Sequence, residues 1–577
     1  MDVKGKASES DGKFVYVRIL YWPMYARYPI CEIARIEGDI DKFDTQYSAL
    51  KVKNNVTHAD TFDDSLLVGL PLSGWQIPED EIERRVDLRN ELIFSIDPPT
   101  AKDLDDALSC VRLPNGNFRV GVHIADVSYF VAQDSPLDLE ARERGNTVYF
   151  VTENIPMLPR ILCDELCSLK GNVDRLAFSV IWELTPTGEK VSEEFVRSII
   201  CTKGQLDYAT AHDMIKNPDA YADDPEMLQC ATAIIDLNNI ATELRKFRYE
   251  NGSISLDNAE IHFDFDEEGN ITGVSPYERY DSHFLVEEFM LLANISVAEK
   301  IFKSMPDGGA MLRWHPKPDP SKLSDFQKQC DSLGLKVDCT NSQTLHESIQ
   351  QIHKEFNGIT MDAILYLASQ PMQSALYTAS SPDAVENAYH HYALNFPLYT
   401  HFTSPIRRYP DLIVHRQLGH IIADEPQTMK CDDVRAISTN CNQRKREADN
   451  ASRDCSRLYL NQYLRTRRFI ESGIVVEVTK STATILVPDY DIRCQISLVD
   501  TEKYSIKYMK ASKTLEVAFK DSDTDRKDWP IVALKLLQTV DVELLYTSQN
   551  FCQTISLQLA KPGERETLKN KNDVQKT

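Results

Sequence analysis

The chain has 577 residues, too many for one hydrophobic core, so we expect several domains. Apolar residues make up 42% and charged residues 26%. No run of about twenty apolar residues occurs, which excludes a membrane-spanning helix and argues against a membrane partner. The net charge of −24 argues against a nucleic-acid partner held on the exterior. Residues 396–468, however, carry 13 Lys and Arg against 8 Asp and Glu, so an internal basic channel stays compatible with the sequence.

The 13 cysteines form no recognisable disulfide framework or zinc motif in the sequence. None pair as C-x-x-C, and the close pair Cys163 and Cys167 has no histidines at zinc spacing. We therefore expect reduced, mostly buried thiols, as in a cytosolic or nuclear protein. Residues 1–12 lack the apolar core of a signal peptide, and their polar composition predicts a disordered tail.

Residues 13–80 contain three β-like runs, FVYVRILYW, YPICEIARI and SALKV, separated by Pro, Gly and Asp. This pattern favours a small β-barrel of the OB type, whose faces bind single strands. An extension along the edge of the following domain fits the same pattern nearly as well.

Residues 81–465 mix strands with helices. Within them, FRVGVHIADVSYFV alternates like a strand or hairpin, residues 282–304 have the pattern of a long buried helix, and residues 430–468 that of a basic amphipathic helix. Residues 466–562 return to β-like runs and predict a second small barrel, and the polar residues 563–577 predict disorder. The expected fold is therefore α+β and multidomain, with a central mixed α/β domain flanked by small OB-type β-barrels.

The strongest motif is ELIFSIDPPTAKDLDDALSC. A strand-like run, Leu92 to Ile96, ends at an aspartate, and the two prolines after it exclude a helix and require an extended loop. In an extended segment Asp103 and Asp105 point the same way, with Leu104 turned to the other face, and the loop can return Asp97 beside them. The motif thus predicts a cluster of four carboxylates: Asp97, Asp103, Asp105 and Asp106.

Four clustered carboxylates repel one another unless a cation neutralises them. Oxygen ligands with no nearby His or Cys favour magnesium over zinc, and two magnesium ions are the usual device for in-line phosphodiester cleavage. A solvated acidic turn is the alternative, although apolar residues flank the loop on both sides. A phosphatase of the D-x-D type fits poorly, because Thr100, Ala101 and Lys102 rather than a strand precede Asp103.

The segment YTHFTSPIRRYPDLIVHR joins a loop to a predicted helix. Pro405 suits the first turn of that helix, and Thr403 or Ser404 could cap it. The N–H groups of such a helix start bind phosphate, and an arginine beside them adds bidentate contacts and stabilises charge in a transition state. The alternative is an ion-paired helix start, with Arg408 bonded to Asp411, and we assign one of the two adjacent arginines to each role.

Two glutamates and two tyrosines are further candidates. Glu287 and Glu288 interrupt an apolar helix pattern, and a buried carboxylate needs a partner or a metal. One of them facing Arg407 or the metal site fits this pattern about as well as a salt bridge without a catalytic part. Tyr149 and Tyr208 could stack unpaired bases, although the pattern alone favours packing tyrosines.

Together these segments resemble the RNB exoribonuclease family, the ribonuclease II superfamily. The resemblance rests on IDPPTAKDLDDALS, VGVHIADVSYFV, NIPMLPRILCDELCSL, VEEFMLLAN and YTHFTSPIRRYPDLIVHR, which occur in the family's order from residue 91 to about residue 420. It implies an RNB domain flanked by cold-shock-type and C-terminal OB domains. It also implies a magnesium-dependent, processive 3′-to-5′ hydrolase that releases nucleoside 5′-monophosphates from single-stranded RNA, with manganese as a substitute metal and no small-molecule cofactor.

The resemblance also implies a role for each candidate residue. Asp97, Asp103, Asp105 and Asp106 match the metal ligands, and the last two are also taken as catalytic. Arg407, Tyr208 and Glu288 match catalytic positions, with Glu287 left as an alternative to its neighbour. The residues taken as RNA contacts are Tyr149, Ser404, Arg408 and Glu287.

The chain departs from the family pattern at its N-terminal end, where the residues before Leu92 fit one OB domain instead of two. The segments AKDLDDALSC, HIADVSYFV and MLPRILCDELCSL are similar to those of the exosome-independent cytoplasmic branch of the family, which prefers RNA with 3′ oligouridine tails. We therefore expect a cytoplasmic monomer that acts on RNA with a free 3′ end. A catalytically silent RNA-binding regulator on the same fold is the alternative, and the intact carboxylate motif speaks against it.

Overall fold

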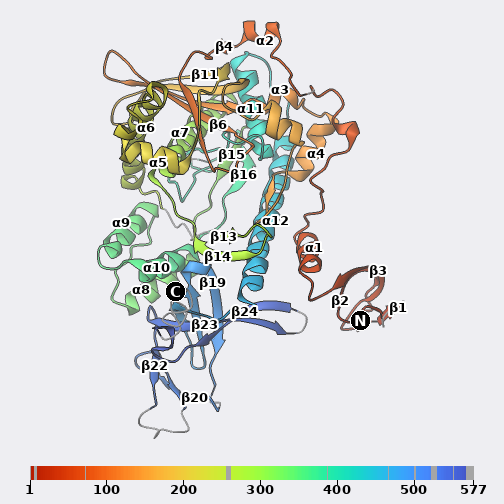
Figure 1. Cartoon of the computed structure of the whole chain (residues 1–577), viewed down its shortest axis with the longest axis vertical. Helices are drawn as coiled ribbons and strands as arrows, with labels where there is room; N and C mark the ends of the chain where they lie inside the picture. The colour runs from red at the N-terminus through yellow and green to blue at the C-terminus, as the bar shows by residue number, and fades with distance from the viewer. Residues whose placement is uncertain are drawn as a thin grey trace.

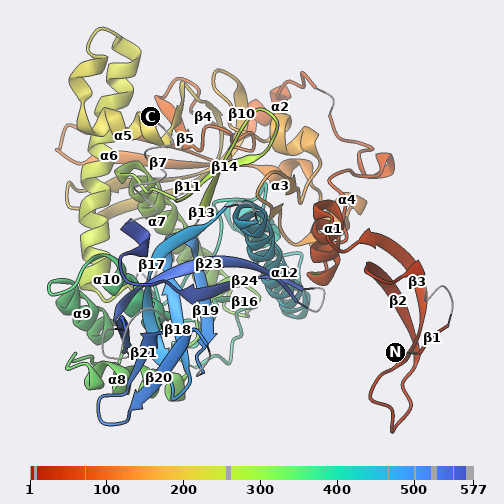
Figure 2. The same ribbon diagram turned by 60° about the horizontal axis from the view of Figure 1, so that its bottom comes forward.

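The computed structural model describes residues 2–4, 9–71, 73–254, 261–385, 387–465, 467–499, 502–520, 529–549 and 552–566. A body of sheet and helices lies at one end of the molecule and a sheet-rich unit at the other, with a small N-terminal sheet set to one side (Figures 1 and 2). The long helix α12 (Cys431–Leu464) runs from the body to the sheet-rich unit (Figure 1). This arrangement confirms the expected α+β, multidomain fold.

A seven-stranded sheet forms the centre of the body, in the order β12-β5-β6-β7-β10-β11-β4. The pairs from β5 through β11 are antiparallel, and the edge strands β12 and β4 are parallel to their neighbours. The strands are β4 (Val86–Asp87), β5 (Ile93–Asp97), β6 (Asp106–Arg112), β7 (Phe118–Ala125), β10 (Asp174–Leu184), β11 (Lys190–Cys201) and β12 (Gly204–Asp207). The segment expected as a strand or hairpin after residue 118 is β7 followed by the short helix α3 (Val127–Phe130).

Helices cover this sheet and bury its apolar residues. Helix α7 (Asp281–Ser304) buries an apolar face in this core, and Trp182 of β10 donates its indole N–H to Ser296 Oγ of that helix at 3.1 Å. The long buried helix and the basic amphipathic helix predicted from periodicity are both present, as α7 and α12. The helices of the body are α4 (Pro136–Arg144), α5 (Tyr208–Lys216), α6 (Pro225–Glu250), α7 (Asp281–Ser304) and α11 (Tyr409–Ile422).

A second group of helices packs between the body and the sheet-rich unit, with a core of its own that includes residues of β17 (Phe469–Val478) and β18 (Thr482–Val487). These helices are α8 (Pro320–Ser332), α9 (Ser342–His353) and α10 (Gly358–Ser369). Three two-stranded pairs connect the parts: β8 (Val148–Tyr149) with β9 (Asn154–Ile155), β13 (Ile261–Phe265) with β14 (Ile271–Pro276), and β15 (Met311–Trp314) with β16 (Leu376–Ala379).

The C-terminal unit is built on a five-stranded antiparallel sheet, β19-β18-β17-β23-β24. Its outer strands approach each other, because Cys494 Sγ of β19 lies 3.3 Å from the carbonyl oxygen of Ile555 in β24, so the sheet is nearly closed like a barrel. Its strands are β17 (Phe469–Val478), β18 (Thr482–Val487), β19 (Ile492–Ser497), β23 (Thr539–Gln549) and β24 (Cys552–Leu559), with a smaller sheet of β20 (Tyr504–Met509), β21 (Thr514–Phe519) and β22 (Ile531–Leu534). The boundaries 466–562 stay a prediction, and the tail predicted at 563–577 lies outside the described residues from 567 on.

The N-terminal segment differs from the expectation in two respects. Residues 1–12 were predicted to be disordered, but the short strand β1 (Asp2–Lys4) pairs in parallel with β3 (Ile30–Asp39), beside β2 (Lys13–Tyr21). The run SALKV was predicted to be a strand but lies in helix α1 (Phe43–Lys53). The helix forms because Phe43, Tyr47 and Leu50 recur at helical spacing and pack on α12. The three described strands are fewer than the five of an OB barrel, so the OB domain at 13–80 stays a prediction.

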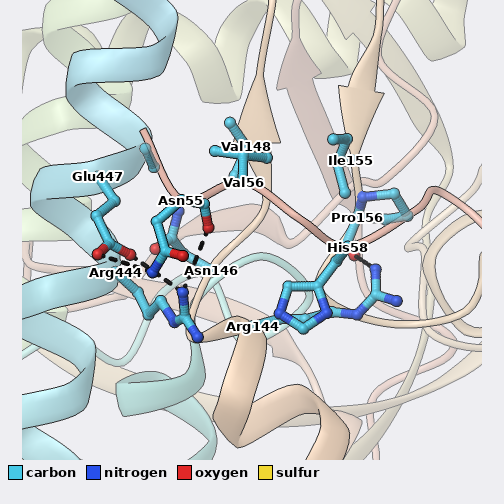
Figure 3. Close-up of a pocket in the computed structure, with 11 residues that line it drawn as sticks. Asn55, Val56, His58, Arg144, Asn146, Val148, Ile155, Pro156, Arg444 and Glu447 are labelled. Atoms are coloured by element: carbon cyan, nitrogen blue, oxygen red, sulfur yellow. Dashed lines mark hydrogen bonds and ion pairs between the residues drawn. The ribbon is translucent and has the colours of Figure 1, made fainter. Parts of the chain in front are cut away.

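The loop after α1 fastens this segment to the body, at a small pocket between α12 and the β8–β9 pair (Figure 3). Asn55 Nδ2 donates to Glu447 Oε1 at 3.1 Å, and Arg444 Nη1 donates to the same glutamate at 3.1 Å (Figure 3). His58 lies 3.6 Å from Glu140 of α4, and burial lowers the pKa of this histidine. Polar contacts from two helices thus hold the loop in place.

Among the described residues, no helix combines the length and the apolar character needed to cross a lipid bilayer. The described cysteines are free thiols and most of them are buried, in agreement with the expectation from the sequence.

Candidate active site

Two aspartates come together where three strands of the central sheet end. Asp97 is the last residue of β5 and Asp106 is the first of β6, and these antiparallel neighbours bring both residues to the same edge. Strand β12 runs parallel to β5 with Asp207 opposite Asp97, so the following residue, Tyr208, also arrives at this edge. The pairing of strands therefore gathers residues that lie 111 positions apart in the chain.

The loop between β5 and β6 is tied down by its backbone and is not a solvated acidic turn. Leu104 is buried in the core, its N–H donates to Ser168 Oγ at 3.1 Å, and its carbonyl oxygen accepts from the N–H of Leu169 at 3.0 Å. Ser168 Oγ also donates to the carbonyl oxygen of Lys102 at 2.7 Å. With the loop fixed in this way, Asp105 is only 4% exposed.

Asp105 is held from the other side by the segment that precedes α11. The backbone N–H of Ile406 donates to Asp105 Oδ1 at 2.9 Å, and Arg407 Nε lies 3.4 Å from Asp105 Oδ2. The Arg407 side chain also donates to Ser404 Oγ at 3.0 Å and keeps 44% of its surface exposed. The arginine therefore sits between the buried carboxylate and solvent, where it can also reach a bound anion.

Tyr149 joins the site through the same segment. The N–H of Thr147 donates to the carbonyl oxygen of Arg407 at 3.0 Å, and Asn146 forms a β-bridge with Arg408. This short pairing places the next strand, β8, so that the Tyr149 hydroxyl donates to Asp103 Oδ2 at 3.3 Å. The tyrosine is 41% exposed, which leaves its ring available to a ligand.

Burial dominates the electrostatics of the cluster. It raises the pKa of Asp97 to about 7, with further contributions from Asp105 and Asp103, and it raises the pKa of Asp106 to about 7, with a contribution from Asp97. It also raises the pKa of Asp105 well above the ordinary value, against the lowering effect of Arg407. Such shifts mark a group of carboxylates that gains from a bound cation.

The donor chemistry of the cluster fits a hard divalent cation. Within the described residues, Asp97 Oδ2 and Asp105 Oδ2 are buried without a hydrogen-bond partner, and carboxylate oxygens are the ligands that magnesium and manganese prefer. No three His, Cys, Asp or Glu side chains in the described ranges are grouped so that they could hold one ion as they stand. The aspartates of the cluster are therefore suitable ligands for a cation, but their side chains are not arranged to bind one ion together.

The two glutamates lie with other partners. Glu288 is buried and forms an ion pair with Arg248 of α6, whose guanidinium also donates to Ser253 Oγ at 3.0 Å. Glu287 pairs with Arg279 and lies 3.5 Å from Arg248. Both glutamates thus form ion pairs with Arg248 or Arg279, so the geometry favours the salt-bridge alternative. A direct catalytic role for Glu288 stays a prediction.

The start of α11 differs from the expectation. The helix begins at Tyr409 and not at Pro405, and its N-cap is Arg408, without a side-chain cap from Thr403 or Ser404. The reason is Asp411, which accepts the N–H of Ser404 at 2.8 Å and two nitrogens of Arg408 at 2.7 and 2.9 Å. These bonds fold residues 404–408 into a turn over the helix start. Arg408 therefore has the ion-paired position, and Arg407 is the arginine beside the carboxylates.

Two contributions to the site were missed from the sequence. One is the backbone N–H of Ile406, because a main-chain donor carries no sequence signal. The other is His283 of α7, whose ring stacks on Tyr208 with centroids 3.8 Å apart and planes 9° apart. A lone histidine before an apolar helix pattern gives no hint of this contact.

Comparison with known proteins places the chain in a family. The RNB domain matches residues 85–424. DIS3-like exonuclease 2 of Xenopus tropicalis is 41% identical over 474 residues, which cover 80% of this chain and 57% of that protein. The chain spans about half the length of the curated relatives it matches.

Solved structures show the same fold at low sequence identity. RNase R of Mycoplasma genitalium, in complex with ribose-methylated single-stranded RNA, matches with a TM-score of 0.79 and 19% identity, over 95% of this chain and 83% of that chain. Yeast Ssd1, described as a pseudonuclease, also matches with a TM-score of 0.79, at 20% identity over 96% of this chain and 78% of that chain. At these identities the matches carry the fold alone.

Proposed function

Since the chain belongs to the family of proteins with an RNB domain, we propose that it is a 3′-to-5′ exoribonuclease that depends on a divalent cation. The observation that carries the proposal is the meeting of Asp97, Asp105 and Asp106 with Arg407, whose guanidinium lies 3.4 Å from the Asp105 carboxylate. This combination can hold cations on one side of a phosphodiester and place a positive charge on the other.

The side chains would divide the work as follows. Asp97, Asp103, Asp105 and Asp106 would hold magnesium, and when bound the metal would activate water and stabilise the leaving oxygen. Arg407, half exposed, would meet the charge that develops on the scissile phosphate. The exposed ring of Tyr149 would stack on a base near the 3′ end.

The finer points of the proposal rest on the family resemblance. We expect processive degradation of single-stranded RNA from a free 3′ end to nucleoside 5′-monophosphates, through two magnesium ions or manganese in their place. A preference for 3′ oligouridine, a monomeric and exosome-independent state and a cytoplasmic location are likewise part of the proposal.

A 5′-labelled oligouridine RNA tests the activity directly. With magnesium, wild type should shorten the RNA stepwise from its 3′ end and release uridine 5′-monophosphate, and EDTA should stop the reaction. Asp106→Asn should slow single-turnover cleavage by roughly a thousandfold while RNA binding stays near wild type. Cleavage that persists in EDTA would exclude the metal mechanism.

The second candidate function is a silent RNA-binding regulator, because the fold is shared with a protein described as a pseudonuclease. The presence of all four aspartates favours the enzyme, since a silent protein has no need to bury carboxylates with raised pKa values. The same assay separates the two functions: a regulator would bind the oligouridine and leave its length unchanged in magnesium and in manganese.

A further inference from the structure

Tyr208 is a candidate active-site residue that lies at a helix terminus, where a side chain has little support of its own. It is the first residue of α5, and Asp207 caps the helix by accepting the N–H of Thr210 at 2.7 Å. Asp106 and Asp97 lie near enough to its hydroxyl to contribute, after burial, to a raised Tyr208 pKa. The position of this phenol relative to the carboxylates therefore depends on what holds the ring.

The first turn of α7 supplies that support. Ser282 Oγ donates to the carbonyl oxygen of Tyr208 at 2.6 Å, and the His283 ring lies flat on the Tyr208 ring, with centroids 3.8 Å apart and planes 9° apart. One turn further along α5, His212 stacks on Tyr280 with centroids 5.1 Å apart. The start of α5 is thus fixed to the start of α7 by backbone, hydroxyl and ring contacts.

His283 is itself held rigidly by hydrogen bonds at both ring nitrogens. Its Nδ1 accepts the backbone N–H of Tyr280 at 2.9 Å, so the hydrogen of the neutral ring is on Nε2. Nε2 lies 2.9 Å from the hydroxyl oxygen of Tyr277 and donates to it. Burial, and then Arg279, lower the pKa of His283, so the ring stays neutral at neutral pH. A neutral ring fixed at both nitrogens is a suitable platform for a second ring.

We propose that His283 is a positioning residue that sets the orientation of the Tyr208 phenol beside Asp97 and Asp106. The inference rests on the proposed exoribonuclease function and deepens it. It gives His283 of α7 a role in the active site, and His283 performs this role only by orienting Tyr208. Residues that orient a functional side chain typically change rates by one to two orders of magnitude when they are removed.

The test is a double-mutant cycle on single-turnover cleavage of 5′-labelled oligouridine in magnesium. His283→Ala should lower the rate by roughly 10- to 100-fold. His283→Phe, which keeps a flat ring on Tyr208, should recover most of that loss. In a Tyr208→Ala background the further change His283→Ala should alter the rate by less than about twofold, because the residue to be positioned is gone.

His346→Ala provides the matched control. This histidine also stacks flat on a tyrosine, Tyr249, with planes 4° apart, but its ring lies against α6 and not against the carboxylate edge. Its removal should change thermal stability and leave the cleavage rate per folded molecule within about twofold of wild type. Melting temperatures of all variants are recorded so that a loss of folded protein is not counted as a loss of rate.

Two results would overturn the inference: His283→Ala cleaving within about twofold of wild type, or the same loss in both backgrounds. Affinity for the oligouridine is measured in parallel in EDTA. If wild type binds but never cleaves, the proposed function has failed by itself, and the cycle is read from the dissociation constants. Coupling between His283 and Tyr208 in those constants then supports the positioning role, and additive effects reject it.

Discussion

Burial holds the pKa of Asp97 at about 7, and this has a consequence for stability. In the unfolded chain the pKa of an aspartate is about 3.9. Between these two pH values the folded protein keeps a proton on Asp97 that the unfolded chain has lost. The contribution of this proton to the free energy of unfolding is therefore complete below a pH of about 4 and is lost as the pH rises to about 7. In chelator, Asp97→Asn should raise the melting temperature by roughly 2 °C or more at pH 7.5 and much less at pH 4.5. An equal gain at both pH values would show that Asp97 ionises normally.

Arg407 and Arg408 are adjacent in sequence, but their contacts predict opposite defects. Arg407→Ala should slow single-turnover cleavage more than it weakens RNA binding, because the half-exposed guanidinium faces developing charge. Arg408→Ala should instead lower stability by about 3–5 kcal/mol, since it leaves the fully buried Asp411 without its ion pair. Stopped-flow cleavage and urea unfolding measure the two effects. Weak RNA binding with a normal rate in Arg407→Ala would make this residue an RNA contact only.

Tyr149 should determine where degradation stops. Its exposed ring and its bond to Asp103 place a stacking surface beside the carboxylates. A stacked base contributes about 1–3 kcal/mol to binding, so Tyr149→Ala should release RNA while it is still several nucleotides longer than the wild-type end product. Denaturing gels of exhaustive digests report the length. Tyr47→Ala, which removes a tyrosine that packs on Phe150 instead, is the control and should leave the end product unchanged.

At the level of elements, the ion pair between α6 and α7 gives Glu288 a structural role, and its catalytic role stays a prediction. Arg248 and Glu288 are 6% and 4% exposed and pair with each other. Arg248→Ala should cost about 3–5 kcal/mol of stability, because it leaves a buried carboxylate uncompensated. Glu288→Gln should cost less and keep the cleavage rate per folded molecule close to that of wild type. A large loss of rate without loss of stability in Glu288→Gln would instead support the catalytic assignment.

The elements with strong periodicity could be predicted from the sequence, and those set by distant contacts could not. Helices α7 and α12 were found because their apolar residues repeat over many turns. The strand predicted for the run SALKV was wrong, because these residues form a helix that depends on packing against α12, about 400 residues away. The predicted start of α11 was wrong as well. Pro405 suits a helix, but hydrogen bonds to Asp411 hold the residues before Tyr409 in a turn.

At the scale of the whole molecule, the carboxylate cluster was predictable because a strand, two prolines and closely spaced aspartates are local features. What completes the cluster is not local: Asp105 receives the N–H of a residue 301 positions away, and Tyr208 arrives through the pairing of β12 with β5. Sequence reasoning also missed the exposed aromatic loop between β2 and β3, where Trp22 and Tyr25 are 61% and 95% exposed, because a β-like run gives no sign of which face stays uncovered.

The depth of the carboxylates predicts the direction of attack. Asp105 is 4% exposed and one carboxylate oxygen of Asp97 and one of Asp105 are buried, whereas the neighbouring Tyr149 and Arg407 are partly exposed. The middle of a continuous strand carries bulk on both sides of each phosphate and cannot reach such a recessed group, whereas a free end can be inserted. A circular oligouridine should therefore survive conditions that degrade the linear RNA of the same sequence, and a 3′-phosphate should delay the first cut. A duplex should require a 3′ single-stranded overhang. Equal cleavage of the circular and the linear RNA would mean that the middle of a strand can reach the carboxylates, and the protein would then be an endonuclease.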